Sequence, residues 1–199
     1  MTTSLFNSSL TTLAPLAGSS LAKKALLVFG GSLFLAALSQ VAIGYPVPTT
    51  LQTLAVMLIG LTFGFRLATA TVALYLLAGA AGLPVFAKFS AGLVTLGGPT
   101  GGYLAGFLLA AALIGYLADR GFTKSWVGTI AALVAGEAII FGLGTPWLGF
   151  MLAEKLGWTT AQVVQYGFTD FIGVDAVKVA LAALIGKGVL KGAEQFAKL

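Results

Sequence analysis

The sequence predicts an all-α membrane protein, a polytopic bundle of six transmembrane helices, and three observations support this fold class. Of 199 residues, 58% are hydrophobic and only 9% are charged, whereas soluble domains carry about 25% charged residues. The mean hydropathy is +1.01. Six apolar segments alternate with short stretches that contain proline, glycine or charged residues. A soluble fold of this size has too little interior to bury so much apolar surface, so lipid must solvate much of it.

The sequence contains no histidine and no cysteine. Their absence excludes disulfides, thiolate or histidine metal sites, and the Ser-His and Cys-His catalytic arrangements. The phosphate-binding pattern GxxxxGK[ST] is also missing. These features argue against a polytopic membrane enzyme, and we expect no cofactor.

Each predicted transmembrane segment is an apolar run that ends at a helix breaker or a charge. A helix needs about 20 apolar residues to cross a bilayer, and the second and third runs are shorter than this. The run after Lys23 and Lys24 is too long for a cleaved signal peptide. We expect a loosely attached cytoplasmic tail at 1–22, a membrane domain at 23–192 and a cytoplasmic tail at 193–199. The predicted segments are 25–44, 51–63, 67–82, 101–118, 126–143 (with Pro146 marking the break) and 172–190.

The basic residues predict the orientation of the bundle. Six crossings place both termini on one side, and that side then holds most of the eleven basic residues: Lys23, Lys24, Arg66, Arg120, Lys124, Lys187, Lys191 and Lys198. Lys88 and Lys155 fall on the opposite side, and Lys178 lies at or inside the membrane. By the positive-inside rule both termini are cytoplasmic. This distribution explains the net charge of +5 without nucleic acid, and it leaves two long exterior loops at 83–100 and 144–170.

Three ionisable residues fall within the predicted segments: Glu137, Asp175 and Lys178. Such groups are costly in lipid, so they tend to face a cavity and to have partners. Asp175 and Lys178 are three residues apart and share one face of a helix. They form either a local ion pair that lowers the insertion cost or two sides of a ligand site. Glu137 is expected to bond a neighbouring helix.

Two further motifs suggest contacts with a ligand. In "PVPTTLQTLAV" Thr50 and Gln52 present polar groups where a helix begins, although Thr50 also fits the role of an N-cap. In "GGPTGGYLAGF" the glycine density lets the backbone approach a ligand closely. Pairs of small residues four apart indicate either internal helix packing or, for Ser32 and Ala36, docking against another membrane protein.

The motifs "VPTTLQTLAVMLIG", "GLPVFAKFSAG", "GGPTGGYLAGF" and "DAVKVALAA" occur in an order that resembles the BioY family. BioY proteins are the biotin-specific substrate-binding (S) components of energy-coupling-factor (ECF) transporters. The resemblance covers about 25–190 and implies a six-helix bundle that encloses the vitamin near the extracellular side of a bacterial cytoplasmic membrane. The substrate-binding residues that it implies are Thr50, Gln52, Phe86, Lys88, Phe89, Tyr103, Asp175 and Lys178.

The same resemblance implies biotin as the transported substrate. Asp175 matches the ureido N–H groups of biotin, and Lys178 matches either the ureido oxygen or the carboxylate. The implied partners are a transmembrane coupling protein and two ATP-binding-cassette ATPases, and transport alone or as a homo-oligomer stays open. The remaining alternatives are an S component for another small vitamin, a polytopic membrane enzyme and a structural membrane protein.

Overall fold

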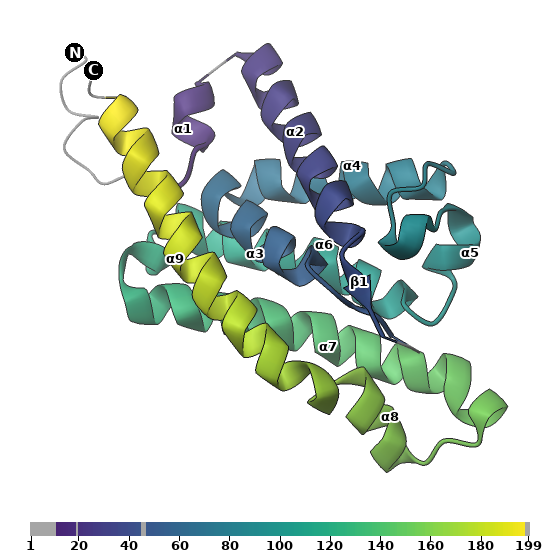
Figure 1. The fold of residues 1–199 in the computed structure, drawn as a ribbon. Helices are drawn as coiled ribbons and strands as arrows, with labels where there is room; N and C mark the ends of the chain where they lie inside the picture. Colours follow the sequence, from purple (N-terminus) through teal and green to yellow (C-terminus); the bar gives the residue numbers. More distant parts are fainter. Residues whose placement is uncertain (1–10, 19, 45–46, 198–199) are drawn as a thin grey trace.

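The computed structural model describes residues 11–18, 20–44 and 47–197, and this part of the chain is mostly helical. The bundle consists of the long helices α2 (Leu21–Ser39), α3 (Gln52–Phe63), α4 (Phe65–Ala80), α6 (Gly101–Asp119), α7 (Trp126–Leu156) and α9 (Ile172–Phe196) (Figure 1). Short helices at its ends are α1 (Ala14–Ala17), α5 (Gly92–Leu96) and α8 (Thr160–Gly167). Three-residue 3₁₀ turns occupy Ala87–Phe89, Phe122–Lys124 and Thr169–Phe171.

A two-stranded antiparallel ribbon connects α2 to α3. Strand β1 (Ala42–Ile43) pairs with β2 (Thr49–Thr50), and Ala42 lies opposite Thr50. The ribbon reverses the chain, so α3 enters the bundle directly after Thr50. The predicted first segment, 25–44, is therefore wrong at both ends, because α2 begins at Leu21 and ends at Ser39.

Helix α6 is the central element, and it packs against α3, α4 and α7. Helix α2 covers α3 and α4, and α9 packs chiefly against α3. Glycine allows the closest approaches: a Cβ added to Gly106 on α6 would lie 2.8 Å from the Cα of Ile140 on α7, and one on Gly60 would lie 2.9 Å from the Cβ of Ile114. The small residues thus pack inside the bundle. Ser32 is buried too, so the alternative that its stripe docks another protein is wrong.

Helix α7 continues far beyond the predicted break at Pro146. It ends at Leu156, and most of the segment predicted as a long exterior loop is helical, formed by the end of α7 and by α8. Proline is tolerated in membrane helices where neighbouring groups compensate for the lost backbone bond. Here Thr145 Oγ1 donates to Gly167 O at 3.0 Å and Trp147 Nε1 donates to Gly98 O at 2.8 Å, which anchors both sides of the proline.

The N-terminal segment packs more closely than predicted. Thr12 is buried, its hydroxyl donates to Asp119 Oδ1 at 3.2 Å, and Leu13 N donates to Thr62 O at 2.6 Å. The prediction of a loosely attached tail is therefore wrong for the described residues from Thr11 to Gly18, and residues 1–10 lie outside the description. At the other terminus α9 runs to Phe196, beyond the predicted start of the tail at residue 193.

The helices have the composition of a multi-pass membrane protein. Within the described part of the chain, α2, α6 and α7 are long and apolar enough to cross a membrane, and α3 and α4 are apolar but shorter. Helix α9 is long enough at 25 residues but carries several charges. The fold class is confirmed as helical and membrane-embedded, and the count of six crossings stays a prediction.

Replacing Gly106 by alanine tests the close α6–α7 contact. The new methyl group would meet the backbone of Ile140, which cannot move aside like a side chain, so we expect Gly106→Ala to lower the melting temperature of the purified protein. Overpacking of this kind costs about 1–3 kcal/mol. Gly142→Ala on α7 is the matched control because no heavy atom of another described segment lies within 4 Å of its added Cβ. Equal melting temperatures for the two variants would contradict the packing described here.

Candidate ligand-binding site

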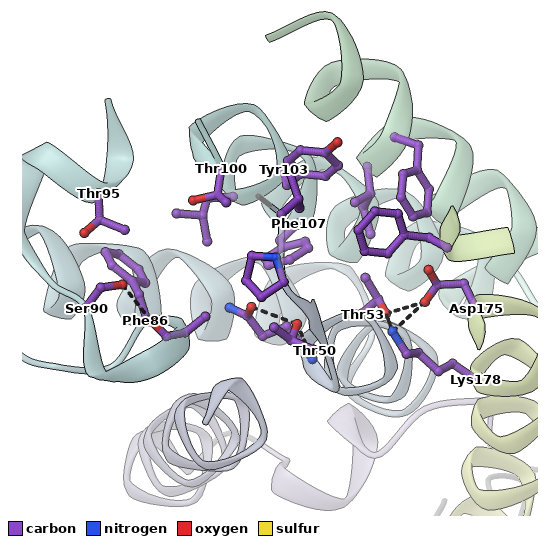
Figure 2. A pocket seen from close by; sticks show the side chains of 18 residues that line it. Thr50, Thr53, Phe86, Ser90, Thr95, Thr100, Tyr103, Phe107, Asp175 and Lys178 are labelled. Carbon is purple, nitrogen blue, oxygen red and sulfur yellow. Dashed lines mark hydrogen bonds and ion pairs between the residues drawn. The ribbon is translucent and has the colours of Figure 1, made fainter. Parts of the chain in front are cut away.

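A pocket opens at the end of the bundle where β2 leads into α3. Its lining comes from α3, α6, α7, α9 and the chain segment between α4 and α5 (Figure 2). Most of the wall is apolar and aromatic, and the polar side chains are few, which is the usual character of a small-molecule site. The aromatic lining residues are Phe86, Tyr103, Phe107, Phe141 and Phe171.

Asp175 and Lys178 form one polar side of this pocket. The two side chains are almost fully buried, and Lys178 Nζ lies 2.6 Å from Asp175 Oδ1. Thr53 of α3 bridges them: its hydroxyl donates to Asp175 Oδ1 at 3.0 Å and accepts from Lys178 Nζ at 3.1 Å. The three side chains converge in Figure 2 and join α9 to α3.

One carboxylate oxygen of Asp175 is not engaged by any described residue. Its Oδ2 is buried and has no hydrogen-bond partner in the described part of the protein. A buried carboxylate oxygen normally has a donor, and this one belongs to a residue that lines the pocket. The ion pair is confirmed, but it does not satisfy the carboxylate completely, so the ligand-site reading stays a prediction beside it.

Thr50 and Gln52 also line the pocket, where a local hydrogen-bond network fixes their side chains. Thr50 Oγ1 donates to Gln52 Oε1 at 2.9 Å and accepts from the backbone N–H of Gln52 at 3.2 Å. Gln52 Nε2 donates to the hydroxyl of Tyr75 on α4 at 2.7 Å. Thr50 therefore closes a turn before α3 instead of capping the helix, whose N-cap residue is Leu51.

Phe86 is the buried anchor of the segment that crosses the pocket. Its ring is 1% exposed, packs edge-on against Tyr75 with centroids 5.4 Å apart, and lies against Gly79. A Cβ on Gly79 would overlap the ring, so only glycine leaves room for it. Phe86 thus joins the pocket to α4.

The end of α2 fastens this segment through two residues that sequence reasoning missed. Ser39 Oγ donates to Val85 O at 2.6 Å, Gln40 Nε2 donates to Phe86 O at 3.2 Å, and Gln40 Oε1 accepts from the backbone N–H of Phe89 at 2.9 Å. Both residues fall inside the predicted first transmembrane segment, where the amide of Gln40 in an apolar run is the same signal that pointed to Gln52.

Lys88 and Phe89 belong to the same turn but do not line the pocket. Phe89 is 69% exposed, and Lys88 Nζ donates to Gly44 O at 3.0 Å. Both residues adopt left-handed backbone angles, with φ near 57° and 56°, which are uncommon for residues other than glycine. In a tight turn only some of the residues can face the pocket, and here these are Phe86, Ala87 and Ser90.

The ring of Tyr103 lines the pocket, and its hydroxyl forms a hydrogen bond to the backbone outside the pocket lining. The hydroxyl donates to Gly167 O at 2.7 Å, the same carbonyl that accepts from Thr145. The ring packs edge-on against Phe141 at 6.0 Å. Of the eight predicted site residues, the structure therefore brings Thr50, Gln52, Phe86, Tyr103, Asp175 and Lys178 together around one pocket.

Nothing in the sequence indicated that Thr53 belongs to the pocket. Thr53 follows Gln52 in the motif "PVPTTLQTLAV", but its partners Asp175 and Lys178 lie 122 and 125 residues away. Phe107, Phe141 and Phe171 were missed because an aromatic residue in an apolar helix looks the same in a core and in a pocket wall.

Glu137 of α7 lies outside the pocket lining, although Ile140 and Phe141 one turn further along line it. The side chain is 8% exposed, and neither of its carboxylate oxygens has a hydrogen-bond partner among the described residues. The expected bond to a neighbouring helix is thus absent from the described structure. No cluster of three or more potential metal ligands occurs in the described ranges either.

Comparison with known proteins identifies the family. The BioY family matches residues 7–195, which is nearly the whole chain. The chain belongs to the BioY family. Among its relatives, a biotin transporter BioY of Thermotoga maritima is 43% identical over 140 residues, covering 70% of this chain and 79% of the relative. A biotin transporter BioY2 of Lactococcus lactis is 35% identical, covering 81% and 86%.

A solved structure shares the fold of this BioY-family chain. It is the crystal structure of the S-component for biotin from an ECF-type ABC transporter, with a TM-score of 0.76 and 26% sequence identity. The alignment covers 87% of this chain and 94% of that structure. The match supports the ECF S-component type of bundle that the sequence predicted.

Removing the hydroxyl of Thr53 tests the bridge between the two charges. In Thr53→Val, Asp175 loses a donor and Lys178 loses an acceptor in a buried site, which costs about 1–3 kcal/mol, so we expect a lower melting temperature. Thr62→Val on the same helix is the matched control, because Thr62 is also buried but donates only to Leu58 O of its own helix. If Thr53→Val and Thr62→Val lower the melting temperature equally, the Thr53 bridge contributes no more to stability than a hydroxyl bond within one helix.

Proposed function

We propose that this protein is the substrate-capture (S) subunit of a biotin uptake system and that it binds biotin in the pocket between α3, α6, α7 and α9. The observation that carries the proposal is the buried Oδ2 of Asp175, an acceptor without a partner among the described residues, beside a lysine fixed by an ion pair. The family match and the relatives named biotin transporters support biotin as the ligand. Biotin is the transported substrate, and the proposal includes no cofactor and no catalytic step.

The polar groups of the pocket suggest how biotin lies in it. The ureido ring carries two N–H donors and one carbonyl acceptor, so an N–H donates to Asp175 Oδ2 while Lys178 donates to the ureido oxygen. The apolar bicyclic core then packs against Phe107, Phe141 and Phe171. The valerate chain extends toward the hydroxyl-bearing side of the pocket formed by Ser90, Thr95 and Thr100.

The pocket lies at one end of the bundle, and the described N-terminal segment from Thr11 and the last turns of α9 lie at the other, which supports the proposed orientation. Asp119 contacts the N-terminal segment through Thr12 and the α3–α4 junction through Phe65 N, so these parts share one end with the last turns of α9 (Figure 1). We place that end on the cytoplasmic side of a bacterial inner membrane, as the positive-inside rule indicates. The pocket then faces the extracellular side.

The partners of the protein follow from its class. The structural neighbour is a component of an ECF-type ABC transporter, and we propose that this chain also works with a transmembrane coupling protein and two ATPases. Assembly as a homo-oligomer is the alternative arrangement. An S component for another small vitamin is disfavoured by the names of the relatives, and an enzyme is disfavoured by the lack of histidine and cysteine.

Isothermal titration calorimetry with biotin tests the proposal. We expect Asp175→Asn and Lys178→Ala each to weaken the binding of biotin by about 10- to 100-fold, because a hydrogen bond to a charged group contributes about 1.5–3 kcal/mol. Asp170→Asn is the matched control, since it makes the same change at an exposed residue outside the pocket. Circular dichroism and gel filtration establish that each variant is folded.

The outcomes separate the two roles of the ion pair. Folded variants that bind biotin as tightly as the native protein would leave the pair with a structural role only and would remove the proposed binding site. If the native protein fails to bind biotin but binds another vitamin, the result would instead favour an S component for that vitamin.

A further inference from the structure

A second hollow lies at the end of the bundle opposite the pocket. It is formed by the 3₁₀ turn Phe122–Lys124, the first turn of α7 and the last turns of α9. Three lysines and one glutamate line it, so its charge is positive; these residues are Lys124, Lys187, Lys191 and Glu194. None of them lines the proposed biotin pocket.

Lys187 builds the floor of this hollow. Its Nζ donates to Thr123 O at 3.1 Å and to Lys124 O at 2.8 Å, and it lies 5.0 Å from the ring centroid of Trp126. These contacts fix the turn and the indole against α9. Lys124 and Lys191 are both exposed and flank the hollow.

An apolar stripe leads away from the hollow along α7. Trp126, Ile130 and Val134 recur every four residues, and each is about half exposed, at 51%, 45% and 51%. In a membrane helix such a stripe faces the acyl chains, and tryptophan marks the level of the headgroups. The hollow therefore lies where the polar headgroup of a lipid meets the apolar part of the bilayer.

We infer that this hollow binds the phosphodiester headgroup of an anionic phospholipid. Lys124 and Lys191 contact the phosphate, Trp126 packs beside the glycerol region, and the acyl chains follow the stripe on α7. Basic pockets between membrane helices recognise anionic headgroups in this way. The apolar stripe on α7 favours a lipid over free phosphate, because free phosphate has no acyl chain to contact the stripe. The net positive charge of the hollow favours an anionic lipid over a zwitterionic one.

Quenching of Trp126 by brominated lipids tests the inference. The protein is placed in phosphatidylcholine nanodiscs that contain a minor fraction of phosphatidylglycerol. Two samples with the same content of brominated lipid are compared: in one the brominated lipid is phosphatidylcholine, and in the other it is phosphatidylglycerol. The part of the quenching that disappears in Trp126→Phe reports the hollow, because Trp147 and Trp158 lie elsewhere. We expect stronger quenching by brominated phosphatidylglycerol, with an enrichment of about fivefold for each lysine that contacts the headgroup.

The variant Lys124→Gln with Lys191→Gln should remove most of that enrichment, a loss of up to about 30-fold if the two lysines act additively. The matched control is Lys155→Gln, which removes an exposed lysine from the C-terminal end of α7 and should leave the enrichment within twofold. Unchanged biotin binding by all variants would show that the pocket is intact.

Three results would overturn the inference. Equal quenching by the two brominated lipids would show that the hollow does not select charge. An equal loss in Lys155→Gln would assign the enrichment to the general charge of the protein. Reversal by millimolar inorganic phosphate would identify a site for the free ion and not for a lipid.

Discussion

The pairing of Asp175 with Lys178 is the interaction on which the pocket depends. An isolated charge in a dry helical bundle is unstable, and two opposite charges are tolerated only where geometry and further hydrogen bonds compensate for their lost hydration. Thr53 supplies those bonds from α3 and ties it to α9. Because the bridge engages one carboxylate oxygen and not the other, the same arrangement that makes the charges tolerable also leaves a directed acceptor beside aromatic walls.

Close packing of the surrounding helices supports the pocket walls beside this charge pair. In lipid, association of helices rests on close packing of backbones instead of on expulsion of water. Gly60 and Gly106 bring α3 and α7 within contact of α6, the helix at the centre of the bundle. The scaffold then positions side chains from the two halves of the sequence around one space, and the hydroxyl of Tyr103 fixes the pocket wall to the carbonyl of Gly167.

Composition and spacing were enough to predict the membrane bundle and the facing pair on α9, since both follow from local physical costs. The resemblance added Phe86 and Tyr103, which the structure places in the pocket. Three features escaped prediction for different reasons. Thr53 acquires its meaning only from partners more than 120 residues away. Pro146 looks like a helix break because the sequence does not show the neighbours that support the helix on both sides. Lys88 and Phe89 turn outward because of a backbone conformation that residue type does not reveal.

The hydrogen bonds from Ser39 and Gln40 make the position of the pocket segment depend on the end of α2. One serine hydroxyl and one amide side chain at the tip of α2 bond to Val85 O, Phe86 O and Phe89 N. Phe89 is one of two residues in this turn with a left-handed backbone conformation. The buried ring of Phe86, packed against Tyr75 and Gly79, holds the same segment to α4. In the proposed function, a ligand in the pocket would lie against a segment whose position depends on α2 as well as on the buried ring of Phe86.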